Sequence, residues 1–219
     1  FRDTGNALAA ELNWSVAGPL GFVKLTDPAI FNSAYAATTQ LSVEQFSLFD
    51  YTRYGTGLNF ELVRRVSDPL SFSLFIGASA NTVDIGGSLM YDKRDSAVLP
   101  KKGWFFSGRV ENTLDAFGSG LTFSRTDLRS GWYRPISKKW RFAAGMDLQT
   151  IMGASVADLP IDSRVFNGGP NSVRSFAQRE LGPFATGGQT PLGGTSAFFA
   201  SAELSYEIIT NLEFAVFAD

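Results

Sequence analysis

Apolar residues alternate with small or polar residues along many short runs of this chain. In the run from 70 to 77, Leu70, Phe72, Leu74 and Ile76 are separated by serine and phenylalanine. The runs from 8 to 16, 140 to 148 and 212 to 219 alternate in the same way. A period of two predicts β-strands, because successive side chains of a strand point to opposite faces of a sheet. Helical periodicity is hard to find, so we predict an all-β fold of antiparallel strands.

Turn signals separate these runs. Dipeptides whose second residue is proline occur at 18–19, 27–28, 68–69 and 134–135. At roughly 18–20 residues for a strand and its connection, the chain supplies about eleven or twelve strands.

The residues between the apolar positions favour a membrane setting for this sheet. They are mostly serine, threonine, asparagine, glycine and alanine, whereas the exposed face of a soluble sandwich is rich in charge. Tryptophan falls near the ends of runs, at Trp14, Trp104, Trp132 and Trp140. An apolar outer face with aromatic girdles and a polar interior is typical of a transmembrane β-barrel. A soluble β-sandwich or a lipocalin-like barrel is the alternative.

Composition excludes several kinds of chemistry. The 219 residues include no cysteine and no histidine, and the formal net charge is −2. The usual zinc sites, disulfide scaffolds, thiol nucleophiles and Ser-His-Asp triads are therefore excluded. Asp158 and Asp162 lie in a loop with no partner base nearby in the sequence. We predict no enzyme activity, no metal, no cofactor and, without basic blocks, no nucleic-acid partner.

One long segment interrupts the succession of strands. Residues 151–196 are dense in glycine and proline and carry apolar and cationic side chains in their middle. Loops much longer than about 15 residues in compact domains are usually functional or disordered. We expect this loop to fold into the lumen of the barrel.

The middle of this loop reads VFNGGPNSVRSFAQRELGP over 165–183. It resembles the signature loop of the BamA/TamA-type outer-membrane β-barrel assembly superfamily, which has an aromatic, Gly-Gly, Val-Arg-Gly-aromatic and Leu-Gly-Pro. Ser175 departs from this pattern, because the family usually has glycine after the arginine; either φ is not positive here, or the turn tolerates a small side chain. The matching residues are Phe166, Gly168, Gly169, Val173, Arg174, Phe176, Leu181, Gly182 and Pro183.

Four further segments are similar to this superfamily in the same order, at 21–31, 91–104, 192–204 and 217–219. The second has a Tyr-Asp-x-Arg-Asp strand end followed by Pro-x-x-Gly, which we interpret as a charged cap at the periplasmic end of a strand. Five ordered segments across nearly the whole chain identify it as a member of the superfamily, nearest to the BamA type. The strand-end residues are Tyr91, Asp92, Arg94, Asp95, Pro100 and Gly103.

Two carboxylates are expected to meet the arginine of the loop. Glu203 shares a face with Ser201 and Ser205, and Asp219 lies on the polar face of the last run. Both therefore point to the predicted lumen, and the planar guanidinium of Arg174 can bind two carboxylates at once. The resemblance implies the same pairing. We call Arg174, Glu203 and Asp219 the ionic anchor; the alternative is that Arg174 is a solvated cation of the lumen.

The resemblance also implies a function. Such proteins fold β-barrel precursors and insert them into the outer membrane through a lateral seam, without a nucleotide. The implied partners are unfolded outer-membrane proteins, assembly-complex lipoproteins, chaperones and membrane lipids. The implied location is the outer membrane of a Gram-negative bacterium, ahead of an organelle outer membrane. A two-partner secretion transporter or a passive channel is the alternative function.

Family barrels have about sixteen strands, more than this chain supplies. We therefore expect residues 1–219 to form a single partial barrel domain that contains the lumen loop 151–196. The POTRA domains and the first and last strands are expected outside this chain.

Overall fold

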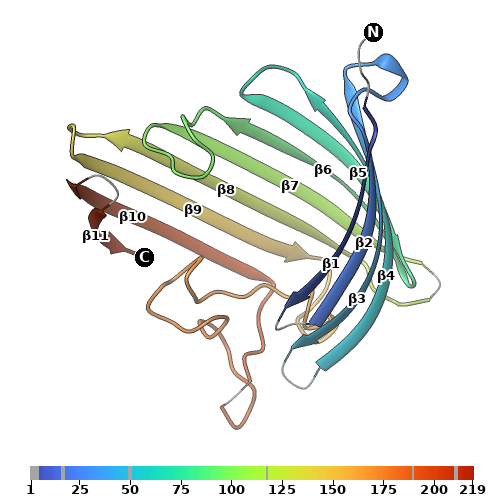
Figure 1. Cartoon of the computed structure of the whole chain (residues 1–219). Helices are drawn as coiled ribbons and strands as arrows, with labels where there is room; N and C mark the ends of the chain where they lie inside the picture. Colours follow the sequence, from blue (N-terminus) through green and yellow to red (C-terminus); the bar gives the residue numbers. More distant parts are fainter. Residues whose placement is uncertain (1–4, 16–17, 49–50, 117, 189, 210–211) are drawn as a thin grey trace. The chain divides into compact units, whose positions relative to one another are not determined.

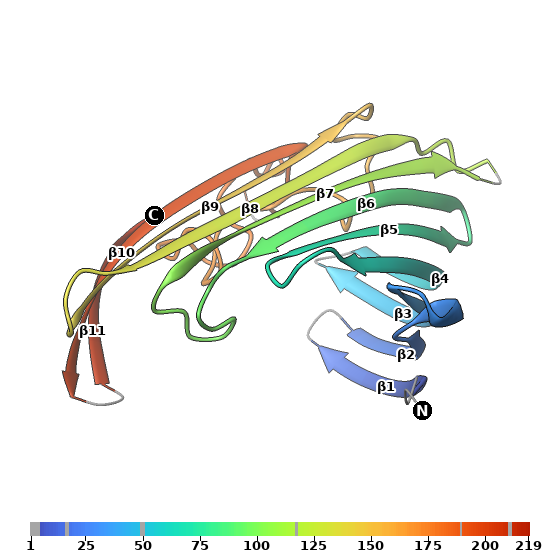
Figure 2. The ribbon, with the colours of Figure 1, turned by 90° about the horizontal axis from the view of Figure 1, so that it is seen from above.

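The computed structural model describes residues 5–15, 18–48, 51–116, 118–188, 190–209 and 212–219. Their eleven strands form one sheet in which the strand order follows the sequence (Figures 1 and 2). This confirms the prediction of an all-β fold and the expected number of strands. The strands are β1 (Ala7–Ser15), β2 (Gly18–Asp27), β3 (Tyr35–Leu48), β4 (Tyr51–Arg65), β5 (Leu70–Ser79), β6 (Thr82–Asp92), β7 (Gly103–Asp115), β8 (Phe123–Pro135), β9 (Trp140–Met152), β10 (Ser196–Ile209) and β11 (Leu212–Ala218).

Helical structure in the described ranges is limited to a 3-10 turn, η1 (Ile30–Asn32). Within those ranges no helix has the length and apolar character needed to cross a membrane.

The chain divides into two compact units. The first contains residues 1–89, 109–125 and 151–163, and the second contains residues 90–108, 126–150 and 164–219. Strands β6 to β9 contribute residues to both units, and the loop after β9 is divided between them.

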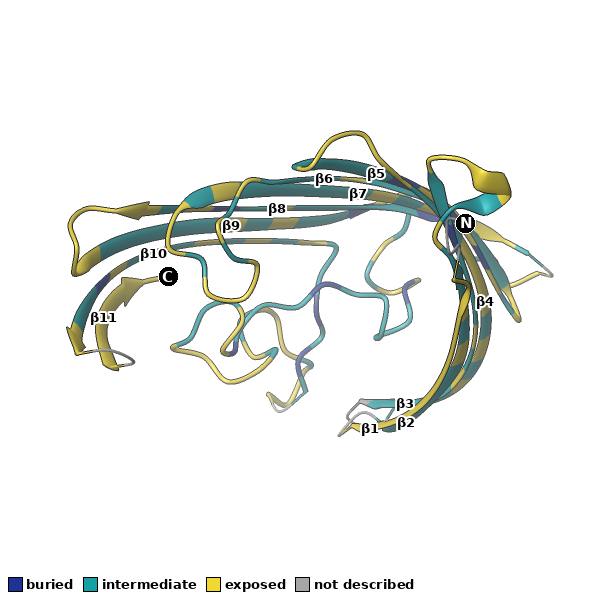
Figure 3. Ribbon diagram, turned by 45° about the horizontal axis from the view of Figure 1, so that its top comes forward, coloured by how far each residue is buried: buried dark blue, intermediate teal, exposed yellow. Residues whose placement is uncertain are grey.

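Strand β5, in the first unit, shows how exposure is distributed. Leu74 and Ile76 are 59% and 47% exposed, whereas Ser73 and Phe75, which alternate with them, are 4% and 5% exposed. Exposed segments in yellow are interspersed with intermediate segments in teal along the strands in Figure 3. In water, exposure of the aliphatic positions would be unfavourable by about 25 cal/mol for each Å². This inversion is the one expected where hydrocarbon replaces water outside the sheet.

The opposite face of the first unit is packed around small and paired polar groups. The Ser73 hydroxyl lies 2.8 Å from that of Ser88, and the guanidinium of Arg109 lies 3.7 Å from the centroid of the Phe75 ring. A Cβ atom on Gly86 would lie 2.3 Å from the Phe75 ring. Glycine at this position therefore leaves the space that the ring occupies.

Strands β9, β10 and β11, in the second unit, build the wall that carries the ionic anchor. Both neighbours of β10 pair with it in antiparallel register. Glu203 lies opposite Ala143 of β9 and Phe217 of β11. Because side chains of directly opposed residues share a face, Glu203 and Phe217 project to the same side, as does Asp219 two residues further on.

Candidate functional site

The loop between β9 and β10 folds back on itself in the second unit. Isolated bridges join Val165 to Gly194, Asn167 to Leu181, and Phe184 to Pro191. The side-chain amide Nδ2 of Asn167 also donates to the backbone carbonyl of Phe198 in β10, at 3.1 Å. These contacts give the segment a fixed path beside β10 without regular secondary structure.

Two adjacent glycines set the turn at the start of the signature segment. Gly168 and Gly169 have φ values of 102° and 104°, a region that disfavours side chains. A Cβ on Gly168 would also lie 2.6 Å from the carbonyl oxygen of Ala177, which is too close for any real contact. The turn thus needs glycine for both its dihedral angles and its packing.

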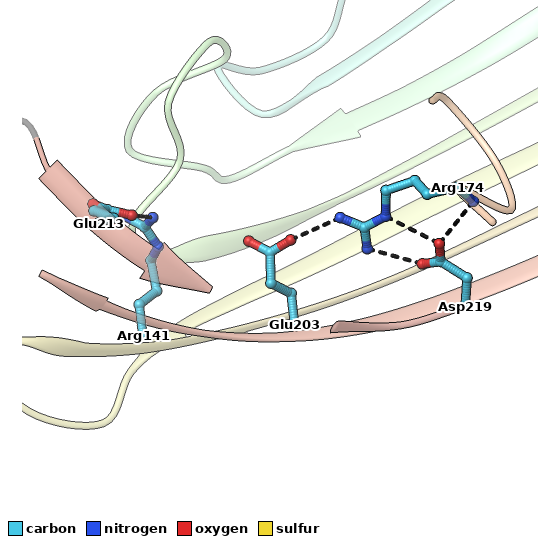
Figure 4. Close-up of polar contacts among 5 residues, drawn as sticks. All are labelled: Arg141, Arg174, Glu203, Glu213 and Asp219. Atoms are coloured by element: carbon cyan, nitrogen blue, oxygen red, sulfur yellow. Dashed lines mark hydrogen bonds and ion pairs between the residues drawn. The ribbon is translucent and has the colours of Figure 1, made fainter. Parts of the chain in front are cut away.

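Arg174 joins the loop to two strands (Figure 4). Its Nε and Nη2 donate to Oδ2 and Oδ1 of Asp219, at 3.0 and 2.8 Å, and its Nη1 donates to Oε2 of Glu203 at 3.1 Å. The backbone N–H of Arg174 donates to the same Asp219 carboxylate at 2.9 Å. The structure therefore brings together the three residues of the predicted ionic anchor.

Burial and charge make this contact stronger than a surface ion pair. The Asp219 side chain is only 2% exposed, whereas those of Arg174 and Glu203 are about one-third exposed. Hydrogen bonds to Asp219, and secondarily to Glu203, raise the pKa of the Arg174 guanidinium above its usual value. Arg174 thus stays cationic, and its paired charges hold the loop to β10 and β11.

The Phe217 ring forms a contact that the sequence did not lead us to expect. The guanidinium carbon of Arg174 lies 3.4 Å from the centroid of this ring. A cation over an aromatic face is stabilised by the ring quadrupole, by about 0.5–2 kcal/mol. The alternation of Phe217 with Val216 was the available signal, because it places the ring on the face of Asp219.

A second ion pair crosses β10. Arg141 of β9 contacts the carboxylate of Glu213 of β11, and β10 lies between these two strands (Figure 4). Neither Arg141 nor Glu213 is among the site residues predicted from the sequence. The pair connects the strands that flank β10 on the face that carries the ionic anchor.

The remaining signature residues lie along the loop away from the Arg174 contacts. The Phe166 ring lies 5.5 Å from the guanidinium of Arg179, and Leu181 pairs with Asn167. Phe176 is 44% exposed, and the carbonyl of Pro183 accepts a hydrogen bond from Leu192 at 2.9 Å. The carbonyl of Val173 accepts hydrogen bonds from the backbone N–H groups of Gly169 and Phe176, at 3.2 Å each. Gly182 has a φ of 157°. These residues shape the loop, whereas Arg174 attaches it.

Ser175, the departure from the family pattern, needs no special backbone. In the described ranges, positive φ at residues other than glycine occurs at Phe31, Asn32 and Arg179. The structure thus resolves the alternative that the sequence left open, because φ at Ser175 is not positive.

The strand-end motif closes the connection between β6 and β7 in the second unit. Arg94 donates to the Asp92 carboxylate at 2.6 Å, and its guanidinium lies 4.2 Å from the Phe105 ring centroid. Tyr91 stacks on Trp104, with ring centroids 4.5 Å apart. Gly103 has φ 107°, and a Cβ there would lie 2.1 Å from the Lys93 carbonyl oxygen. Pro100 precedes this close approach within the same turn.

Asp95 ties this turn together and makes its stability depend on pH. The Lys102 and Lys101 backbone N–H groups donate to Oδ1 of Asp95, at 3.1 and 2.9 Å, and lower its pKa. A carboxyl whose pKa is lower in the folded state stabilises that state above its unfolded pKa. This stabilisation is lost as the pH falls through the folded pKa.

We therefore expect the amide proton shifts of Lys101 and Lys102, followed by NMR during acidification, to move together. Their common midpoint should lie below the ordinary aspartate pKa. A midpoint at or above that value would contradict this assignment. Asp95→Asn, which cannot ionise, is the control and should abolish the transition.

The first part of the loop has its own contact, within the first unit. Nε of Arg53 in β4 lies 2.9 Å from Oδ2 of Asp162, and its Nη2 lies 2.5 Å from Oε1 of Glu44. Asp162 is 12% exposed at its side chain. Asp162 has no partner base nearby in the sequence, because Arg53 lies more than a hundred residues earlier.

Arg53→Ala should weaken this part of the loop by about 1–2 kcal/mol, since it leaves a largely buried carboxylate without its cation. The expected result is faster hydrogen exchange of the Ser163 amide, which donates to the Pro160 carbonyl at 3.0 Å. Arg65→Ala, an exposed position at the far end of β4, is the matched control. Equal exchange in both variants would show that Arg53 does not hold Asp162.

Within the described ranges no group of three or more Asp or Glu residues is placed to hold a metal ion. The charged groups of the site instead pair with one another. The arrangement therefore positions and attaches a loop.

Comparisons with known proteins agree with this geometry. An Omp85 superfamily domain matches residues 77–219. The chain is 30% identical over 103 residues to the sorting and assembly machinery component 50 homolog of Mus musculus, across 46% of this chain and 21% of that protein. It also matches a crystal structure of BamA from Haemophilus ducreyi lacking POTRA domains 1–3, with a TM-score of 0.86 and 16% identity, over 98% of this chain and 51% of that one. The chain thus spans about half or less of the proteins it matches.

An antiparallel sheet with exposed aliphatic side chains, together with the Omp85 domain match, defines the class, an outer-membrane β-barrel protein. The chain belongs to the Omp85 superfamily. This confirms the superfamily, the barrel fold and the outer-membrane location that the sequence predicted.

Proposed function

We propose that this chain is the barrel region of an outer-membrane protein assembly factor of the BamA type. Such a factor folds β-barrel precursors and inserts them into the membrane through a lateral seam. The observation that carries the proposal is the match of 98% of the chain to the BamA structure, with a TM-score of 0.86. Membership of the Omp85 superfamily and the similarity to a sorting and assembly machinery component support it.

The ionic anchor would serve this function by fixing the loop. Arg174 binds the loop to β10 and β11 through Glu203 and Asp219, so the loop and these two strands are restrained together. A client strand that pairs with a sheet edge needs an edge of fixed register. We propose that the anchored loop stabilises this part of the wall while clients are inserted, without covalent chemistry or a cofactor.

The proposed partners are unfolded outer-membrane proteins, accessory lipoproteins, periplasmic chaperones and membrane lipids. POTRA domains and further strands in the intact protein are part of the same proposal. We propose a Gram-negative bacterial outer membrane as the setting.

Reconstitution tests the function. The intact protein, placed in vesicles, should speed the folding of an added unfolded barrel client, measured as its protection from protease. The matched control is the same vesicle without the protein.

A secretion transporter would instead move a soluble passenger into the vesicle without speeding client folding. A passive channel would give steady ion conductance alone. Either of these results would overturn the assembly proposal.

A further inference from the structure

Aromatic side chains lie at the same end of five successive strands, in the second unit. Tyr91 is the penultimate residue of β6, Trp104 is the second of β7, and Trp140 is the first of β9. The Tyr91 and Trp104 rings are 4.5 Å apart, and those of Trp140 and Tyr206 are 4.9 Å apart. The three tryptophans are each 41–44% exposed. We call this set the aromatic row: Tyr91, Trp104, Trp132, Trp140 and Tyr206.

Cations flank the aromatic row on the side of the turns. The Lys93 amide donates to the Trp104 carbonyl at 2.9 Å, which places Lys93 across from that residue. Arg134 lies two residues after Trp132 within β8, and a spacing of two along a strand returns a side chain to the same face. Lys102 is exposed in the turn that leads into β7, two residues before Trp104. Nζ of Lys139 lies 5.6 Å from the centroid of the Tyr206 ring. These four exposed residues are the outer cations: Lys93, Lys102, Arg134 and Lys139.

The charge of these turns contrasts with that of the whole chain. Segments 91–103 and 133–141 together contain eight basic and two acidic residues, although the chain has a net charge of −2. Both acidic residues are engaged within their own turn: Asp92 accepts from Arg94, and Asp95 accepts from backbone N–H groups. A positive band therefore borders the aromatic row.

We propose that the outer cations and the aromatic row form a binding surface for anionic phospholipid headgroups. Tryptophan and tyrosine rings favour the boundary between hydrocarbon and headgroups. Two residues along a strand span about 6.6 Å, which carries an ammonium or guanidinium from that boundary into the headgroup region. A phosphodiester there would accept hydrogen bonds from the outer cations. Phosphatidylglycerol has a net negative charge, whereas the choline group of phosphatidylcholine neutralises the phosphate of that lipid.

This surface depends on the barrel fold and its membrane location. It does not depend on the proposed assembly function, so the two proposals can fail separately.

Quenching of tryptophan fluorescence tests the surface, because three of the four tryptophans of the chain belong to the aromatic row. The intact protein is reconstituted in vesicles that contain phosphatidylglycerol or phosphatidylcholine with brominated acyl chains. Attraction of about 1 kcal/mol for each engaged cation corresponds to about a fivefold preference for the anionic lipid. The preference should decrease in 1 M salt, where charges are screened within about 3 Å.

A matched pair of variants separates this surface from general attraction. Lys102→Gln with Arg134→Gln removes two outer cations and should bring the preference to within about twofold of unity. Lys101→Gln with Lys138→Gln removes the same charge from the same two turns. Lys101 and Lys138 line a small cavity with Arg141, Glu207 and Glu213, and Lys139 and Trp140 line it as well. Lys102 and Arg134 are not part of this lining, so the control removes charge beside Glu207 and Glu213 and should keep most of the preference.

Three results would overturn the proposal: an equal loss of preference in both double variants, no preference in the unmodified protein, or stronger quenching by brominated lipid A than by phosphatidylglycerol. A circular dichroism spectrum in phosphatidylcholine vesicles that is unchanged by Lys102→Gln with Arg134→Gln would show that the variant is folded.

Discussion

Arg174→Ala is expected to release the loop while the strands stay paired. The substitution removes three side-chain hydrogen bonds and leaves the Asp219 carboxylate, 2% exposed, without its cation. Loss of a partner from a fully buried ion pair costs about 3–5 kcal/mol, and from an exposed pair less than about 1 kcal/mol. Because Arg174 and Glu203 are partly exposed, we expect a cost of about 2–3 kcal/mol in attachment of the loop.

Chymotrypsin provides the measurement, since it cuts after Phe176 and does not need an arginine. Cleavage at this position in the membrane-embedded protein should become at least about tenfold faster in Arg174→Ala, as a change of 1.4 kcal/mol already gives that factor. Arg129→Ala is the matched control. It removes an arginine that is 59% exposed at its side chain and that pairs with Asp147 at 3.0 Å. Resistance at Phe176 equal to that of the unmodified protein would show that the ionic anchor does not hold the loop.

Gly168→Ala is expected to disrupt the signature turn through a steric clash. The new methyl group would lie 2.6 Å from the Ala177 carbonyl oxygen and 3.1 Å from two backbone nitrogens. Positive φ alone costs alanine about 1–2 kcal/mol, and movement of the opposing backbone adds to this cost. We expect a total of about 3 kcal/mol, since neighbouring hydrogen bonds such as that from Arg179 to the Gly168 carbonyl must also shift.

Gly187→Ala separates the clash from the dihedral strain. Gly187 has φ 108°, close to the 102° of Gly168, but a Cβ there meets no atom within 4 Å. Hydrogen exchange of the peptide 165–183 should therefore accelerate strongly in Gly168→Ala, while Gly187→Ala leaves that peptide unchanged. If the peptide exchanges no faster in Gly168→Ala, the close approach at this turn has no energetic role.

The alternation of residue types was enough to predict the strands, because a period of two has one structural meaning. It also indicated the environment: serine inside and leucine outside at positions 73 and 74 fit lipid better than water. The same alternation placed Glu203 and Asp219 on the polar face of the sheet. Their contact with Arg174 then required only that the loop lie on this polar face. The ends of the long loop were placed within two residues of the observed strand ends, Met152 and Ser196.

Contacts that depend on register were beyond the reach of the sequence. Arg141 meets Glu213 only because β10 pairs with β9 and β11 at particular offsets, and no local pattern specifies these offsets. Arg53 and Asp162 are joined by the path of an irregular loop, for which there is no periodicity to count. The Phe217 ring was overlooked for another reason, since an aromatic on a polar face looks like an exception until a cation is placed above it.

The ionic anchor also constrains the order of events when the chain folds. Arg174 and Asp219 are 45 residues apart in sequence, and β10 and β11 lie between them. Closing a loop of this length costs entropy that only later contacts repay, so such contacts form late. The carboxylates of Glu203 and Asp219 are brought to one side by pairing of β10 with β11. The loop can therefore attach to both carboxylates only after the hairpin of β10 and β11 has formed.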